Sequence, residues 1–274
     1  MPLGLQTNVA SLDIQKNLSR TQSALTTSFN RISSGYRINS AADDAAGLAI
    51  SESMKAQIRS YVIAERNAND AVSMSQTAEG ALGEMHDVLG RMRELAMQSA
   101  NGTMSEIDRE NIGQEYSALQ SELDRIKQST KFNGVDLLSA NAAPITFQVG
   151  LTADPNDQLQ VDFGELDLTD LMGSSVSGTD AANAHTSLGT IDDAIQSISS
   201  QRAQLGAAMN RLSVVTQNIQ TMRLNLSAAN SRIRDTDVAE EMAQLSRSQI
   251  LSQAGVSVLS QANQLPQLAL NLLK

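Results

Sequence analysis

The amino-acid sequence predicts a mainly α-helical fold, an antiparallel coiled-coil rod with one β-hairpin and a pair of terminal helices. Three observations lead to this prediction. Small and apolar residues recur in alternating steps of three and four along three long stretches, a period of two appears between the second and third of them, and only 3% of the 274 residues are aromatic. Aromatic side chains supply the largest buried areas of thick cores, so their scarcity favours narrow seams between long helices.

The first predicted helix carries a heptad seam in which every member is small or apolar. The members are Tyr61, Ala64, Ala68, Ala71, Ser75, Ala78, Leu82, Met85, Leu89, Met92, Ala96 and Ser99. The pair Asn101-Gly102 supplies a left-handed stop for this helix. Because small residues fill the first half of the seam, we expect a partner helix to approach closely there.

A second helix is predicted after a tight turn. Thr103 or Ser105 can cap it, because acidic residues follow three positions later, at the spacing of a capping box. We expect this helix to end near Asn133-Gly134. Its apolar seam consists of Ile112, Tyr116, Leu119, Leu123 and Ile126.

A third seam predicts another long helix, from Leu188 to Ile233. Most of its members are apolar, and Arg202 and Arg223 interrupt it. Polar residues at seam positions more often fix the register of two helices than perform chemistry. Three long seamed helices joined by short turns indicate an antiparallel bundle.

The period changes to two between the second and third helices. Apolar residues alternate on both sides of a turn-forming stretch, Ala153-Asp154-Pro155-Asn156-Asp157, which predicts a β-hairpin over residues 144–164. Residues 164–187 hold three glycines and many serines and threonines, and we expect a flexible surface connection there.

Both ends of the chain are apolar on more than one helical face. The N-terminal stripe contains Leu5, Val9, Leu12, Leu18, Leu25, Phe29 and Ile32, and the C-terminal stripe contains Val238, Met242, Leu245, Leu251, Val258, Leu265 and Leu272. A helix that is apolar on several faces needs more than one partner surface. We expect both ends to drive self-assembly, with Leu251 and Leu265 buried against partner surfaces.

Several sequence segments resemble the signatures of bacterial flagellins. They are Ser33–Ser51 (SSGYRINSAADDAAGLAIS), Thr77–Leu82 (TAEGAL), Arg91–Gln98 (RMRELAMQ), Phe132-Asn133-Gly134, Ile198–Leu212 (ISSQRAQLGAAMNRL), Arg232–Met242 (RIRDTDVAEEM) and Ala254–Leu273 (AGVSVLSQANQLPQLALNLL). These segments follow the family order and span nearly the whole chain outside residues 140–187.

The resemblance implies a domain layout. Residues 1–42 and 235–274 would pair as the inner-tube domain, and residues 43–234 would form the outer rod with its hairpin. The outer domains that many relatives carry after the hairpin are missing here. The resemblance also implies export through the flagellar type III apparatus, consistent with a start that does not read as a cleavable secretory signal. A secretion chaperone would hold roughly residues 235–274 before export.

The resemblance also assigns one candidate contact surface on the rod. Arg91, Leu95 and Gln98 share a helical face by their spacing, and Glu115 on the following helix is expected beside them. In recognised flagellins these positions map to the surface that the vertebrate flagellin-sensing Toll-like receptor engages. The alternative is that this face contacts the next subunit along a filament, and both roles are compatible.

Composition argues against other classes of function. The net charge of −10 and the lack of a basic cluster speak against nucleic-acid binding, and a chain without cysteine has no thiolate metal ligands. Asp43-Asp44 is better explained by helix capping than by acid–base chemistry, and His86 and His185 lie too far apart in the sequence to suggest a metal site. The sequence predicts no enzyme, cofactor, metal site or membrane insertion.

The sequence therefore predicts a structural subunit that polymerises into the extracellular bacterial flagellar filament used for swimming. Its partners would be other copies of itself, together with hook–filament junction and cap proteins. The alternative is a hook–filament junction protein of the same superfamily, which we consider weaker because both ends of the chain match flagellin signatures.

Overall fold

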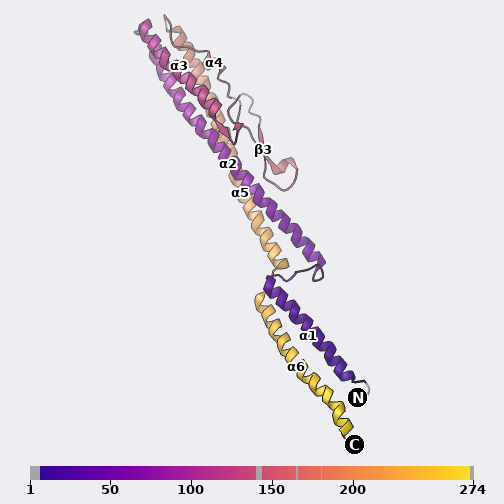
Figure 1. The fold of residues 1–274 in the computed structure, drawn as a ribbon. Helices are drawn as coiled ribbons and strands as arrows, with labels where there is room; N and C mark the ends of the chain where they lie inside the picture. Colours follow the sequence, from indigo (N-terminus) through magenta and orange to yellow (C-terminus); the bar gives the residue numbers. More distant parts are fainter. Residues whose placement is uncertain (1–6, 140–143, 165, 180, 272–274) are drawn as a thin grey trace. The chain divides into compact units, whose positions relative to one another are not determined.

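The computed structural model describes residues 7–139, 144–164, 166–179 and 181–271. Helices dominate these residues, which confirms the predicted fold class (Figure 1). The helices are α1 (Val9–Ser34), α2 (Ala45–Ser99), α3 (Glu106–Ser129), α4 (Thr169–Met172), α5 (Ala182–Arg234) and α6 (Val238–Asn271). The strands are β1 (Lys131–Phe132), β2 (Val135–Asp136), β3 (Ile145–Gln148) and β4 (Gln158–Val161), and a short 3₁₀ turn η1 (Pro155–Asp157) precedes β4.

Packing divides the chain into two compact units. The terminal unit comprises Met1–Ile58 with Leu224–Lys274, and the rod unit comprises Arg59–Arg223. The helices α2 and α5 contribute residues to both. The domain boundaries predicted after residues 42 and 234 lie in the turns that precede α2 and follow α5.

The core of the rod unit lies along the heptad seams of α2, α3 and α5. The predicted α2 seam is buried from Ala64 to Ser99, with Tyr61 half-buried at its start. The most buried apolar positions of α5 recur every seven residues, namely Ile191, Ile198, Leu205, Leu212 and Ile219. In Figure 1 these helices run side by side, so the coiled-coil prediction for the rod is confirmed.

The two arginines on the α5 seam reach carboxylates on α2. Arg202 Nη2 lies 2.9 Å from Glu79 Oε1, and Arg223 Nη1 lies 2.6 Å from Glu65 Oε2. Each ion pair joins one position of α5 to one position of α2. Such pairs are needed if the arginines set the register of the two helices, as predicted.

The helix α3 begins as predicted and ends earlier than predicted. Ser105 and Asp108 form a capping box, and hydrogen bonds from Ser105 lower the pKa of the Asp108 carboxyl. The helix stops at Ser129. Asn133 and Gly134 both adopt positive φ angles, of 48° and 82°, and form the turn between β1 and β2. The Asn-Gly pair is therefore a hairpin turn rather than a helix end.

The predicted β-hairpin is confirmed by the antiparallel pairing of β3 with β4. Ile145 lies opposite Val161, and Phe147 lies opposite Leu159. The loop between the strands is closed by Asp157, whose Oδ2 accepts a hydrogen bond of 2.7 Å from the backbone N–H of Thr152 and another from its hydroxyl. These bonds lower the pKa of the Asp157 carboxyl.

The connection predicted to be flexible is packed onto the core in its described part. Its buried apolar side chains are Leu166, Leu168, Leu171 and Val176. The side chain of Gln120 on α3 donates to the carbonyls of Leu171 at 2.6 Å and Ser174 at 3.0 Å. The many serines and glycines of the segment led to the prediction of flexibility. Its apolar residues cover a side of the core that no further long helix covers among the described residues. We call residues 166–179 the strap.

A buried arginine fastens the end of α2 to the strap. The Arg109 guanidinium donates to the carbonyls of Ser99 at 3.0 Å, Asn101 at 3.3 Å and Thr179 at 3.3 Å. The last carbonyls of a helix have no partner within the helix. Arg109 therefore satisfies the C-terminal end of α2 and holds the strap in the same place.

The seam of the rod unit generates a stability prediction. Leu89 is fully buried, so Leu89→Ala should lower the free energy of unfolding by about 2–5 kcal/mol. Denaturant unfolding followed by circular dichroism measures the change. Met97→Ala is the matched control, because Met97 is exposed on the same helix. Equal unfolding midpoints for Leu89→Ala and the unsubstituted chain would contradict the buried seam.

The hairpin loop generates a prediction about its stability at low pH. Because the pKa of the Asp157 carboxyl is lower in the folded chain, its charged form stabilises the folded loop. This contribution is fully present at pH values above the pKa of the unfolded chain, about 3.9. This contribution should be lost as the pH falls through the lower folded pKa. NMR titration of the Asp157 carboxyl carbon measures that pKa, and Thr152→Val, which removes the hydroxyl donor, should raise it toward the ordinary value. An unchanged titration in Thr152→Val would refute the assigned cause.

Candidate assembly surfaces

The terminal unit is built around an antiparallel pair of helices, α1 and α6 (Figure 1). Their buried and half-buried positions form two facing heptad seams. On α1 these are Ser11, Ile14, Leu18, Thr21, Leu25, Ser28 and Ile32, and on α6 they are Glu241, Leu245, Ser248, Ser252, Gly255, Leu259 and Ala262. Most of the α6 members are small or polar, which allows the helices to approach closely. A Cβ atom added at Gly255 would lie 3.3 Å from Leu18 Cδ1.

Many of the larger apolar side chains of the pair lie outside these seams and point into solvent. The exposed ones are Val9, Leu12 and Phe29 on α1 and Val238, Met242, Ile250, Leu251, Val256 and Val258 on α6. Phe29, for example, is 63% exposed. We call this set, whose α6 members are spread around that helix, the outward apolar face. So many exposed large apolar side chains on two helices indicate surfaces that association covers.

The predicted inner-tube residues divide between these two groups. Leu25 and Ile32 lie in the seam, and Val9, Leu12, Phe29, Leu251 and Val258 lie on the outward apolar face. Leu5, Leu272 and the side chain of Leu265 lie outside the described residues.

Within one chain Leu251 lies at the edge of the α1–α6 pair rather than in its seam, and its burial against partner helices stays a prediction. Leu251 is 54% exposed and, together with Val258, flanks a shallow groove of about 250 Å³ beside Ile14 and Leu18. The physical reason is that the helices close on the small seam residues, because these permit the shortest distance between the two backbones.

Arg91 and Glu115 lie together on the rod, as expected. Arg91 Nε and Nη2 donate to Glu115 Oε1 at 2.9 and 2.8 Å, and Nη1 donates to Glu94 Oε2 at 2.9 Å. The hydrogen bonds to Glu115, followed by those to Glu94, raise the pKa of the Arg91 guanidinium. Both partners of the α2–α3 ion pair are about half exposed, and Gln98, about two turns after Arg91 on α2, is also exposed.

The structure removes Leu95 from this surface, since its side chain is only 2% exposed. On one side of this region Arg91 pairs with Glu115 of α3, and on the other Arg93 pairs with Asp192 of α5 at 2.7 Å. Because two helices cover α2 here, the buried stripe is wider than a single heptad seam. Leu95 is therefore a core residue, and its assignment as a surface contact is wrong.

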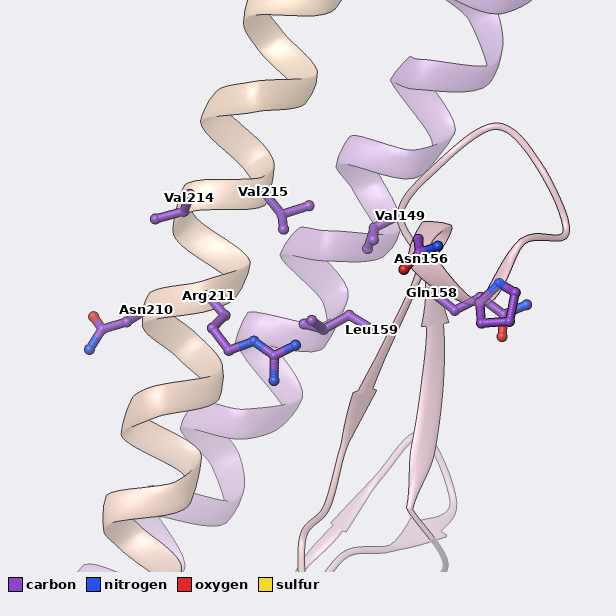
Figure 2. A pocket seen from close by; sticks show the side chains of 9 residues that line it. Val149, Asn156, Gln158, Leu159, Asn210, Arg211, Val214 and Val215 are labelled. Atoms are coloured by element: carbon purple, nitrogen blue, oxygen red, sulfur yellow. The ribbon is translucent and has the colours of Figure 1, made fainter.

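A groove between the β3–β4 hairpin and α5 was not predicted. It has a volume of about 570 Å³, and Figure 2 shows Val149 and Leu159 on the hairpin side with Arg211, Val214 and Val215 on α5. Val214 is 65% exposed. The sequence feature that could have predicted the groove is Val214, because it is an apolar residue outside the α5 seam.

The paired carboxylates near the start of α2 have local structural roles. Asp43 Oδ2 accepts hydrogen bonds from the backbone N–H groups of Asn39 and Ser40, and these, with the Ser40 hydroxyl, lower its pKa. Asp44 Oδ1 accepts from the N–H of Gly47 at 2.8 Å and so caps α2.

The part of the chain that the structure describes holds neither a cluster of metal ligands nor a helix suited to span a membrane. Within the described residues no three side chains of His, Asp or Glu converge in a way that could hold a metal ion. No helix in that part of the chain combines the length and the hydropathy needed to cross a membrane.

A seamed helical rod together with an outward apolar face built from both chain ends defines a helical structural protein suited to self-association. Matches to models of known protein families identify the family within this class. Residues 5–143 match the bacterial flagellin N-terminal helical region, and residues 188–273 match the bacterial flagellin C-terminal helical region. The chain belongs to the bacterial flagellin family.

Individual relatives agree with this assignment. A flagellin of Halalkalibacterium halodurans is 44% identical over 262 residues, which cover 94% of this chain and 93% of the relative. The crystal structure of Bacillus cereus flagellin is 33% identical with a TM-score of 0.50, covering 60% of this chain and 94% of that one. A flagellar hook-associated protein of Vibrio parahaemolyticus, at 14% identity and a TM-score of 0.62, shares the fold over 70% of this chain and 100% of its own.

The contrast between Arg91 and Leu95 generates a prediction. Leu95→Ala should lower the free energy of unfolding by about 2–5 kcal/mol, because it leaves a cavity between three helices. Arg91→Ala should change it little, because exposed ion pairs contribute little to stability. Thermal unfolding followed by circular dichroism measures both. If the two variants were equally stable, Leu95 would belong to the surface after all.

Proposed function

We propose that this chain is a structural subunit that polymerises with copies of itself into the wall of a bacterial flagellar filament. The outward apolar face of the terminal unit is the observation that carries the proposal. A single chain leaves this face in water, and membership of the flagellin family supports a second copy of the same chain as its partner. The filament is extracellular, and we propose export through the flagellar type III apparatus.

Polymerisation follows from the geometry of repeated contacts. When one surface of a subunit binds a different surface of the next, and the contacts do not close into a ring, an open helical polymer results. Burial of the outward apolar face would contribute about 25 cal/mol for each Å² of apolar surface removed from water. We propose that residues 1–42 and 235–274 form the inner tube of this polymer and that residues 43–234 form the rod outside it.

A hook–filament junction protein is the second candidate for the function. The likeness to the hook-associated protein is one of fold, at 14% identity. The relative named flagellin is 44% identical over nearly the full length of both chains. No observation therefore favours the junction protein over the filament subunit.

Further partners are proposals that rest on the same surfaces. The apolar side chains of α6 are suited to a secretion chaperone that covers residues 235–274 before assembly, and the ends of the filament would contact junction and cap proteins. The vertebrate flagellin-sensing Toll-like receptor would engage Arg91, Gln98 and Glu115, without Leu95. The same three residues could contact the next subunit along the filament.

A charge on the outward apolar face tests the proposed assembly. Leu251→Asp should leave the helicity of the free chain unchanged, because Leu251 is half exposed in it. It should block elongation, because the filament would bury an unpaired carboxylate. Electron microscopy after addition of filament seeds measures elongation, and circular dichroism measures helicity.

The matched control is Gln253→Asp, which places the same charge at an exposed polar position of α6. We expect this variant to elongate seeds better than Leu251→Asp. The proposed burial of the outward face fails if Leu251→Asp elongates seeds as well as the unsubstituted chain does.

A further inference from the structure

The groove between the β3–β4 hairpin and α5 combines apolar walls with one cation. We call it the hairpin groove; its apolar members are Val149, Pro155, Leu159, Val214 and Val215. Of the described residues that line it, only Arg211 is charged, and this guanidinium has no hydrogen-bond or ion-pair partner among them or elsewhere in the described chain. Figure 2 shows the Arg211 side chain reaching from α5 toward Leu159 of the hairpin. Such a groove suits a partner that carries an apolar side chain next to a carboxylate.

A second groove lies on the other side of the hairpin and lacks this chemistry. It has a volume of about 370 Å³ and lies between the hairpin loop and α2, beside Ile63 and Ala64. None of the described residues that line it is charged. The unpaired cation therefore distinguishes the hairpin groove as the one suited to an acidic partner.

One exposed apolar side chain of the rod unit has unpaired carboxylates beside it. Ile107, in the first turn of α3, is 71% exposed. Glu110 lies three positions later on the same helical face, and Glu106 directly precedes Ile107. Both carboxylates are exposed, and neither has a hydrogen-bond or ion-pair partner among the described residues. We call Glu106, Ile107 and Glu110 the acidic knob.

The other exposed large apolar residues of the rod unit have no such carboxylates. They are Val62, Ile63, Met97, Val135, Val214 and Met222. Every acidic residue within four positions of them in the sequence forms an ion pair with an arginine or a lysine, namely Glu65, Glu94 and Asp136. Within the described part of the rod unit, the acidic knob is therefore the segment that matches the hairpin groove.

The acidic knob cannot reach the hairpin groove of its own chain. Arg109, two residues after Ile107, donates to the carbonyl of Thr179 at 3.3 Å, so the knob lies near the start of α5 at Ala182. Val214 follows 32 residues later on the same helix, which places it about 48 Å along α5 at ~1.5 Å per residue. A contact between the knob and the groove therefore requires two copies of the chain.

We infer that the acidic knob of one subunit docks in the hairpin groove of the next, with Ile107 against the groove valines and Glu106 and Glu110 beside Arg211. This inference rests on the proposed function, for which it names one contact between rod units. The knob and the groove are different surfaces, so each subunit binds one neighbour through each, and the row continues without closing. Opposite charges at the contact select the correct partner, because like charges there repel strongly.

Charge reversal tests the contact in the full-length chain. Arg211→Glu should raise the critical concentration for seeded elongation about tenfold or more, because it brings a carboxylate up to the acidic knob. Glu110→Arg alone should also raise it. The two together should recover most of the loss, since sites in direct contact are not additive. Circular dichroism should show unchanged helicity, because both side chains are exposed.

The matched control is Arg66→Glu, which reverses another exposed arginine of the rod unit. Arg66 lines neither groove. We expect Glu110→Arg to give no recovery of elongation in this background.

Cysteines report which groove the knob occupies, because the chain has none of its own. In filaments under mild oxidation, Ile107→Cys with Val214→Cys should join each subunit to the next and give a ladder of covalent multimers. Ile107→Cys with Ile63→Cys, at the second groove, should give no ladder. A disulfide requires Cα atoms within about 7 Å, so the Val214→Cys pair cannot close within one chain.

The two readouts separate the docking from the filament function. Additive losses from the two charge reversals, or the absence of a ladder from the Val214→Cys pair, would overturn the docking and leave the filament function standing. A ladder from the Ile63→Cys pair would assign the knob to the second groove and also overturn it. Failure of the unsubstituted chain to elongate seeds would instead overturn the proposed function.

Discussion

The seven-residue spacing of buried positions is the constraint on which both units depend. In the rod unit, large apolar side chains such as Leu82, Leu89 and Leu205 occupy these positions, and the seam closes its own core. In the terminal unit, most seam positions of α6 are filled by small or polar residues such as Ser248 and Gly255. One period with two distributions of side-chain volume yields one self-sufficient core and one helix pair with part of its apolar bulk outside.

This division separates folding from polymerisation. A subunit that buries its largest apolar side chains in its own core folds well, but little driving force for association remains. A subunit that exposes them everywhere aggregates before it folds. In the proposed filament the rod unit supplies a buried core and the two chain ends supply the association. The outward apolar face has members on both α1 and α6, so a chain truncated at either end lacks part of it.

Much of the fold could be predicted from the sequence, because heptad and two-residue periods report directly on which face of an element is buried. The α2 seam, the capping box at Ser105 and the β3–β4 hairpin follow from such local rules. The strap could not, since four apolar residues in a serine- and glycine-rich segment carry no period. The burial of Leu95 could not either, because it depends on how many helices surround α2. For the terminal helices the apolar residues were identified, but their direction depends on the volume of their neighbours, as Leu251 illustrates.

The closed loop of the β3–β4 hairpin makes the chain a candidate scaffold for polyvalent display. Asp157 ties back to Thr152, so the loop is fastened at its base while Ala153 and Pro155 at its tip are exposed. Foreign peptides are tolerated best at exposed tips whose flanking strands keep their pairing. In the proposed filament, an epitope grafted between these residues would be repeated at every subunit, which turns a structural loop into a regular antigen array.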